Sequence, residues 1–253
     1  MALARVHTTA ADGTFSIEGA AAWNAAHGVT GADVGGIPYC PTATTETTSP
    51  LLTFNGTNLG VGENYLSLPG TTGNYASTPD ANPLDITGDI SFVMRLSLSD
   101  WTPAATNAFI SKDTAGQRSY DFQSDSGSTG KILVGFNGLV GATSTVAPTV
   151  SDGATIWIAA TVKANNGAGG WDTKFYTAAD SYADPSTLTW TQLGTTVTTA
   201  TALTIATGTA ALEIGRQGSF GNPMSGKVFR AQVYNGIPTF LGGSSSTLVF
   251  DSN

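Results

Sequence analysis

The feature that most constrains the fold is a series of short alternating segments separated by turns. The clearest segment spans residues 90–98 and has the period of two that is typical of a half-buried antiparallel strand. Its apolar face carries Ile90, Phe92, Met94, Leu96 and Leu98, and its polar face carries Ser91, Arg95 and Ser97.

Similar runs recur along the chain without helical patterns between them. The intervening stretches, such as SDSGSTG, NNGAGG and SFGNP, are typical of turns. About a dozen short strands at this spacing predict an all-β, two-sheet antiparallel jelly-roll sandwich. No internal repeat favours a propeller or a solenoid. The expected further strands are 51–54, 64–68, 107–112, 119–124, 131–136, 155–162, 173–178, 201–206, 211–215, 227–235 and 247–250.

Composition supports this fold class and excludes several partners. Only 11% of the 253 residues are charged and 31 are glycine, a balance that disfavours helices. The net charge of −8 and the lack of any Lys/Arg cluster argue against nucleic acid as a partner. No apolar run is long enough to span a membrane, so we expect no membrane insertion, and the N-terminus does not resemble a signal peptide.

The first 60 residues differ from the rest. Residues 16–28 carry the one convincing helix signal, an Ala-rich stretch with Trp23 as its large side chain and Gly28 as a suitable cap. This short helix could dock on its own domain or on another subunit. Residues 29–50 are rich in Gly, Thr and Pro and predict an extended arm. We therefore expect an N-terminal tether at 1–60 and a sandwich domain at 61–253.

Residues for catalysis are not evident. Both histidines, His7 and His27, lie in the tether, so a Ser-His-Asp triad in the sandwich would require the tether to fold back. The single cysteine, Cys40, cannot form an internal disulfide and is typical of a small buried hydrophobe. The sequence therefore predicts no enzyme and no cofactor.

A calcium site is the one metal site that the sequence leaves open. Asp80, Asn82, Asp85 and Asp89 lie close together in a turn region and offer the oxygen ligands that calcium prefers. The alternative is that these side chains cap the backbone of solvated turns.

Tryptophans suggest a contact surface. Trp101 and Trp171 fall at strand ends, where an exposed ring could stack on a glycan or on another protein. The alternative for both is packing in the core, as we expect for Trp157 inside a strand.

Several motifs occur in a recognisable order between residues 61 and 240. Gly88-Asp89 opens a long strand, Asp152-Gly153 precedes an aromatic strand, and Leu212–Gly215 precedes a closing strand at 226–235. In this order they resemble a laminin-G or concanavalin-A-like jelly roll, a family that includes lectins and glucanases. The resemblance implies the same antiparallel sandwich.

Departures from that family bear on function. Many relatives carry acidic residues in the closing strand that contribute to a cation site, whereas Phe229 and Arg230 stand here. Glucanases of this fold carry a Glu-x-Asp-x-x-Glu array of paired carboxylates. None of the four glutamates, Glu18, Glu46, Glu63 and Glu213, has a second carboxylate two or four residues away. The family's catalytic pattern is therefore absent.

The tether carries a second resemblance. Its pieces Trp23-Asn24-Ala25-Ala26-His27 and Gly36-Ile37-Pro38-Tyr39 are similar to the opening stretches of tailed-phage tail, fibre and decoration proteins. The resemblance implies that Trp23, Asn24, His27, Ile37 and Tyr39 anchor the chain to a partner.

Together these features predict a non-enzymatic structural protein of a tailed-phage virion, assembled in the host cytoplasm. The tether would bind other virion proteins, and the lectin-like jelly roll would serve in tail or fibre adhesion or in capsid decoration. A homo-oligomer, a trimer by analogy with such proteins, and host surface glycans are the further expected partners. The alternatives are a stand-alone carbohydrate-binding module and a divergent glycan hydrolase.

Overall fold

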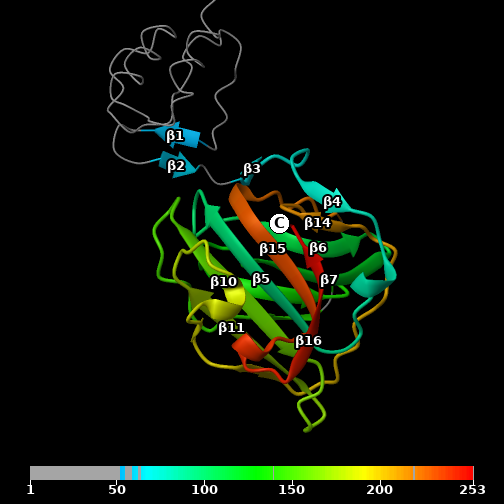
Figure 1. Ribbon diagram of the computed structural model, residues 1–253. Coiled ribbons are helices and arrows are strands. Elements are labelled where there is room, and N and C mark those ends of the chain that lie inside the picture. The colour runs from blue at the N-terminus through cyan, green and yellow to red at the C-terminus, as the bar shows by residue number, and fades with distance from the viewer. Residues whose placement is uncertain (1–51, 55–58, 62–63, 139, 219, 253) are drawn as a thin grey trace, which may run out of the picture. The chain divides into compact units, whose positions relative to one another are not determined.

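The computed structural model describes residues 52–54, 59–61, 64–138, 140–218 and 220–252 (Figure 1). The chain divides into two compact units, Met1–Asn64 and Tyr65–Asn253. In the first unit, β1 (Leu52–Phe54) pairs antiparallel with β2 (Leu59–Val61). The helix predicted at 16–28 and the arm predicted at 29–50 lie outside the described residues.

The second unit contains two antiparallel sheets. Figure 1 shows β11, β10, β5 and β15 side by side in one layer, which crosses in front of β6, β7 and β14. The eight-stranded sheet has the order β12 (Thr191–Gln192), β11 (Trp171–Ala178), β10 (Thr155–Lys163), β5 (Ile90–Leu98), β15 (Ser225–Ile237), β16 (Ser245–Asp251), with β13 (Val197–Thr199) beside β11 and β3 (Leu66–Pro69) beside β15. The six-stranded sheet has the order β4 (Ala76–Thr78), β14 (Leu212–Ile214), β6 (Ala108–Thr114), β7 (Gln117–Ser124), β8 (Ile132–Phe136), β9 (Val140–Thr143). The short 3-10 helices are η1 (Asn82–Leu84), η2 (Pro185–Thr187) and η3 (Thr239–Leu241).

The main core lies between the two sheets. The apolar face of β5 packs against β7, where the Phe92 ring centroid lies 5.4 Å from that of Phe122 and 5.7 Å from that of Tyr120. Truncation of a fully buried phenylalanine such as Phe92 costs on the order of 3–5 kcal/mol. The described part of the second unit is the two-sheet antiparallel jelly-roll sandwich that the sequence predicts.

A second apolar cluster covers the outer face of the eight-stranded sheet. Trp157, Val93 and Tyr234 lie on this face, and Leu241 of η3 packs onto them. The prediction that 90–98 is half-buried was therefore wrong: all nine residues of β5 are buried, Arg95 among them. The expected core position of Trp157 is in this outer cluster rather than between the sheets.

One predicted strand is wrong as well. The segment predicted as a strand at 201–206 forms no strand, although Ile205 is buried. The backbone here is instead held by side chains: Asn137 donates to the Thr204 carbonyl and accepts from the Ala206 amide, and Gln117 accepts from the Thr209 amide. None of the helices among the described residues has the length and apolar character needed to span a membrane.

Candidate functional site

A row of small and polar residues crosses the six-stranded sheet on the face opposite the core. In the register of the sheet, each member lies directly beside the next on the neighbouring strand. The row runs Ser77, Glu213, Ser111, Asp121, Gly135, Gly141. Neighbouring strands are about 4.8 Å apart, so Glu213 and Asp121 are about 10 Å apart at the backbone, with Ser111 between them.

Alternation along β7 explains why these side chains share the outer face. Tyr120 and Phe122 point into the core, which turns Ser119, Asp121 and Gln123 the other way. Gly135 opposite Asp121 makes room for the carboxyl group, because a Cβ at that position would come within 2.6 Å of Asp121 Oδ2. We call Ser111, Ser119, Asp121, Gln123 and Glu213 the polar face.

The polar face is deeply placed and its hydrogen bonding is incomplete. Asp121 is 3% exposed, Ser119 2% and Glu213 8%. Among the described residues, no hydrogen-bond partner reaches Asp121 Oδ1, Ser119 Oγ, Gln123 Oε1 or Glu213 Oε2. A buried polar atom without a hydrogen-bond partner lowers the free energy of unfolding by about 1–3 kcal/mol. Four such atoms on one face therefore indicate groups that bind a ligand or ordered water.

Burial changes the acidity of this face. The pKa of Asp121 is raised to about 7, chiefly by burial and in part by the nearby Asp113, with Arg118 opposing the shift. Burial also raises the pKa of Glu213, with Asp113 acting in the same direction and Arg216 against it. Such perturbed carboxyl groups are typical of functional sites.

Two arginine–aromatic pairs flank the polar face. The Arg118 guanidinium lies 4.5 Å from the Phe220 ring centroid, and that of Arg216 lies 4.4 Å from the Tyr75 ring centroid. Arg118 Nε is 3.6 Å from Asp113 Oδ1, and Arg216 Nε is 3.7 Å from Glu213 Oε2. Phe220 and Tyr75 are 56% and 36% exposed, so aromatic rings are available beside the buried carboxyl groups.

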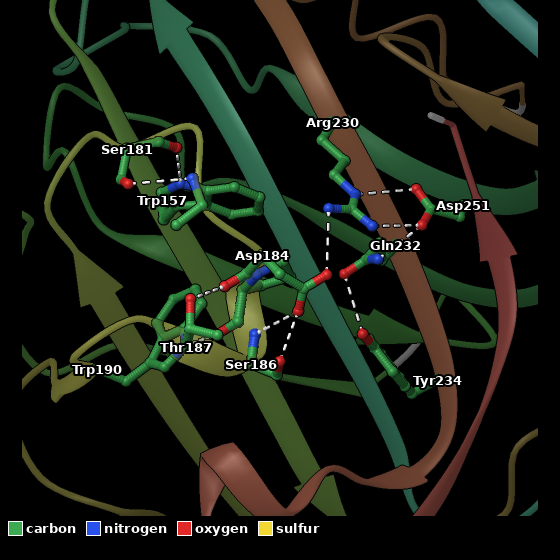
Figure 2. A network of polar contacts seen from close by, with 12 residues as sticks. Trp157, Ser181, Asp184, Ser186, Thr187, Trp190, Arg230, Gln232, Tyr234 and Asp251 are labelled. Atoms are coloured by element: carbon green, nitrogen blue, oxygen red, sulfur yellow. Dashed lines mark hydrogen bonds and ion pairs between the residues drawn. The ribbon is translucent and has the colours of Figure 1, made fainter.

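The outer face of the eight-stranded sheet provides a contrast (Figure 2). Arg230 on β15 binds Asp251 of β16 through two hydrogen bonds of 3.1 and 2.7 Å, and Gln232 donates to the same carboxylate at 2.8 Å. Tyr234 donates to Gln232 at 3.0 Å, and Asp184 caps η2 by accepting from Ser186. This network satisfies its members and ties β16 and η2 to β15, which is a structural role.

Two of the residues considered for calcium, Asp80 and Asp85, pair with a buried lysine instead. Lys112 is fully buried, and its Nζ lies 2.8 Å from Asp80 Oδ1 and 3.1 Å from Asp85 Oδ1 and donates to the Gly208 carbonyl. Asp89 accepts from the Ala164 amide, and Asn82 begins η1. The ammonium group of Lys112 thus occupies the position between the carboxylates that a calcium ion would need. In the described part of the chain, no three His, Cys, Asp or Glu side chains converge to hold a metal.

The tryptophans expected at a contact surface lie in the interior. Trp101 is 4% exposed and donates from its ring to the Ala154 carbonyl, while Trp171 is 1% exposed and packs edge-on against Phe136. Neither ring is presented to solvent, so the packing alternative describes both. The expected anchoring residues Trp23, Asn24, His27, Ile37 and Tyr39 lie outside the described residues.

The residues of the polar face were not found from the sequence. Glu213 and Asp121 are 92 positions apart, and only strand register brings them into one row. A signal existed in the segment SYDFQS, where a carboxylate alternates with two aromatic residues in the middle of a strand.

Comparison with known proteins returns no family and only distant similarities among solved structures. No family model matches the chain, and no curated protein does. Among solved structures, a heptameric pentraxin from Limulus polyphemus is 14% identical, with 69% of this chain and 76% of that one covered and a TM-score of 0.43. The mouse laminin alpha1 domains LG4-5 are 13% identical, and the match covers 76% of this chain and 44% of the laminin chain with a TM-score of 0.46. A putative carbohydrate-binding protein from Bacteroides ovatus is 13% identical, and the match covers 79% of this chain and 56% of the Bacteroides chain with a TM-score of 0.43.

These likenesses are too distant to transfer a ligand or a residue role. The chain spans about half the length of the laminin and Bacteroides chains that it matches. None of the three is a virion protein, so the virion assignment stays a prediction. The function has to be argued from this chain's own geometry.

Proposed function

We propose that this domain is a saccharide-binding module that uses the polar face of the six-stranded sheet. The observation that supports it is the set of four buried oxygen atoms without partners, aligned on adjacent strands. Water alone could fill such positions, but the exposed rings beside them favour a larger ligand that is both polar and apolar.

A sugar ring meets both requirements. Its hydroxyl groups donate and accept, and can therefore serve Asp121 Oδ1, Gln123 Oε1 and Glu213 Oε2 once the residues that cover these buried atoms move aside. Its C–H faces pack on aromatic rings, a contact that Phe220 and Tyr75 can offer here. This assigns to Phe220 and Tyr75 the stacking role that the sequence suggested for Trp101 and Trp171.

The test is a glycan array with the purified protein and the variant Ser119→Ala. Because Ser119 Oγ has no partner among the described residues, its removal should leave the melting temperature unchanged or higher. Loss of one ligand hydrogen bond should weaken saccharide binding roughly five- to tenfold. Ser246→Ala on β16, an exposed serine of the other sheet, is the matched control and should bind as the parent does. No bound glycan on the array would refute the proposal.

Binding without cleavage is proposed, although the face holds two carboxyl groups. A glycoside hydrolase needs one ionised carboxylate beside its general acid. Burial is the largest cause of the raised pKa of both Asp121 and Glu213, and it disfavours the ionised form that one of the two would need. Incubation with the polysaccharides that bind, followed by an assay of reducing ends, tests this: released product would establish the hydrolase alternative.

For the tether we propose an anchoring role in a tailed-phage virion. The support is the resemblance of residues 1–60 to openings of virion proteins, and a tether that displays a glycan-binding module fits adhesion to a host surface. Deletion of residues 1–40 should abolish incorporation into particles. Truncated protein that still assembles would contradict the anchoring role.

A further inference from the structure

The two arginines beside the polar face have unused hydrogen-bonding capacity. Each guanidinium carries five N–H donors, yet Arg118 and Arg216 approach their carboxylates only at 3.6 and 3.7 Å. Neither donates a hydrogen bond of normal length to another described residue. Their side chains are 27% and 28% exposed, so both are partly open to solvent.

The aromatic rings hold these guanidinium groups in place without consuming their donors. The Arg118 guanidinium lies over the Phe220 ring and that of Arg216 over the Tyr75 ring, and a cation–π contact of this kind uses none of the N–H donors in a hydrogen bond. Two guanidinium groups lie beside the polar face. Each is planar and can bind a planar anion such as a carboxylate through paired hydrogen bonds.

The local charge balance permits an anion despite the acidic residues. The groups that face Asp121 are Asp113 on β6 and Arg118 on β7; those that face Glu213 are Asp113 and Arg216. Gly135 on the other side of Asp121 contributes no charge. When Asp121 and Glu213 are protonated, two arginines outweigh the single carboxylate of Asp113. The net charge of −8 repels anions at long range, but salt screens it beyond about 8 Å.

We propose that the polar face binds acidic saccharides, with the sugar carboxylate paired to Arg118 or Arg216 and the sugar hydroxyls on Ser119, Asp121 and Glu213. This inference rests on the proposed saccharide binding and specifies its ligand class. A neutral Asp121 then donates its proton to a ligand oxygen, whereas an ionised Asp121 repels the ligand. Binding therefore weakens as the pH rises through about 7.

The experiment is calorimetric titration of the full chain with a uronic-acid oligosaccharide and with a neutral oligosaccharide of the same length, at about pH 5.5 and about pH 8.5. We expect the acidic ligand to bind roughly tenfold or more tightly than the neutral one at the lower pH, and to lose most of that advantage at the higher. A sulfated oligosaccharide as a third ligand separates carboxylate recognition from general anion attraction; equal binding of the sulfated ligand would overturn the carboxylate assignment.

Variants assign the effect to the residues. Arg118→Gln and Arg216→Gln should each reduce binding of the acidic ligand roughly tenfold and leave the neutral ligand almost unaffected. Lys174→Gln on β11 removes the same charge from an exposed position of the other sheet and should change neither. Asp121→Asn, which stays neutral, should lose less of its affinity for the acidic ligand between the two pH values than the parent does.

The outcomes separate the two proposals. If the neutral ligand binds as well as the acidic one, or if both arginine variants retain the preference, the acidic-saccharide inference fails and saccharide binding stands. If neither ligand binds at about 1 mM, both fail.

Discussion

At the scale of single residues, the environment of Asp121 departs most from what its position in a strand would suggest. Its pKa rises from near 3.8 to about 7 on folding, so the carboxyl group contributes stability below about pH 4 that is lost as the pH rises through 7. Ionising it leaves a buried charge beside Asp113. The strand therefore carries a side chain that costs stability at neutral pH, which is typical of functional positions.

Replacing that carboxyl group should show its cost directly. Asp121→Asn should gain stability over the parent by a few kcal/mol at about pH 8.5 and by much less at about pH 5. Urea denaturation at the two pH values measures the difference. Asp172→Asn is the control of opposite sign, because hydrogen bonds from Asn166 and Thr198 lower the pKa of Asp172, and its contribution is lost as the pH falls. An equal gain for Asp121→Asn at both pH values would contradict the burial argument.

Lys112 is a second residue whose role follows from its surroundings. Lys112→Met should cost roughly 3–5 kcal/mol, because it leaves the carboxylates of Asp80 and Asp85 facing each other without a cation. The free energy of unfolding from urea denaturation is the readout. Lys131→Met, at a partly exposed lysine, should cost far less, and equal losses would argue against an ion-pair role for Lys112.

Residue roles were the least predictable part of the molecule. The sequence places Asp80 and Asp85 near each other in a turn, but the buried cation between them comes from β6, some 30 positions away. Similarly, Asp121 and Glu213 meet only through the register of β7, β6 and β14. Contacts between distant strands depend on register, which local patterns do not encode.

At the scale of elements, β15 and its neighbours show how a polar network can organise a sheet surface. Arg230 joins β15 to Asp251 on β16, and it lies 3.7 Å from Asp184, which caps η2. The hydrogen bonds and charge of Asp251 raise the pKa of Arg230 above its already high value, so the guanidinium group keeps its charge.

The geometry of that pair should matter more than its charge. Arg230→Lys keeps the charge but loses the paired hydrogen bonds, and should cost on the order of 1–3 kcal/mol. Hydrogen exchange should rise within Ser245–Asp251 while the amides of β5 stay protected. If Arg230→Lys exchanges as slowly as the parent throughout β16, the network is not what holds that strand.

Element positions were largely predictable and element surroundings were not. The strand predicted at 90–98 coincides with β5, because its alternation is regular over nine residues. Its polar face was expected in solvent, yet Ser91 donates to the Gly236 carbonyl and Arg95 pairs with Asp180. The segment 201–206 alternates like a strand but is held by Asn137 and Gln117 instead of a neighbouring backbone. Side chains supplied by other elements decide both cases.

At the scale of the whole molecule, the sandwich has its own continuous core within Tyr65–Asn253. A protein consisting of residues 65–253 should therefore fold cooperatively and melt within a few degrees of the full chain. Differential scanning calorimetry of both proteins checks this. A truncated protein without a cooperative transition would show that residues before 65 complete the core.

The buried ammonium of Lys112 has a consequence for where such a domain can work. A cation that belongs to the polypeptide cannot dissociate or be removed by a chelator, and its binding requires no supply from the medium. The turn that Asp80 and Asp85 form should therefore keep its conformation in citrate or phosphate as in calcium-rich surroundings. Recognition on the polar face would then respond to acidity, while the turn of Asp80 and Asp85 would hold its form without a divalent ion.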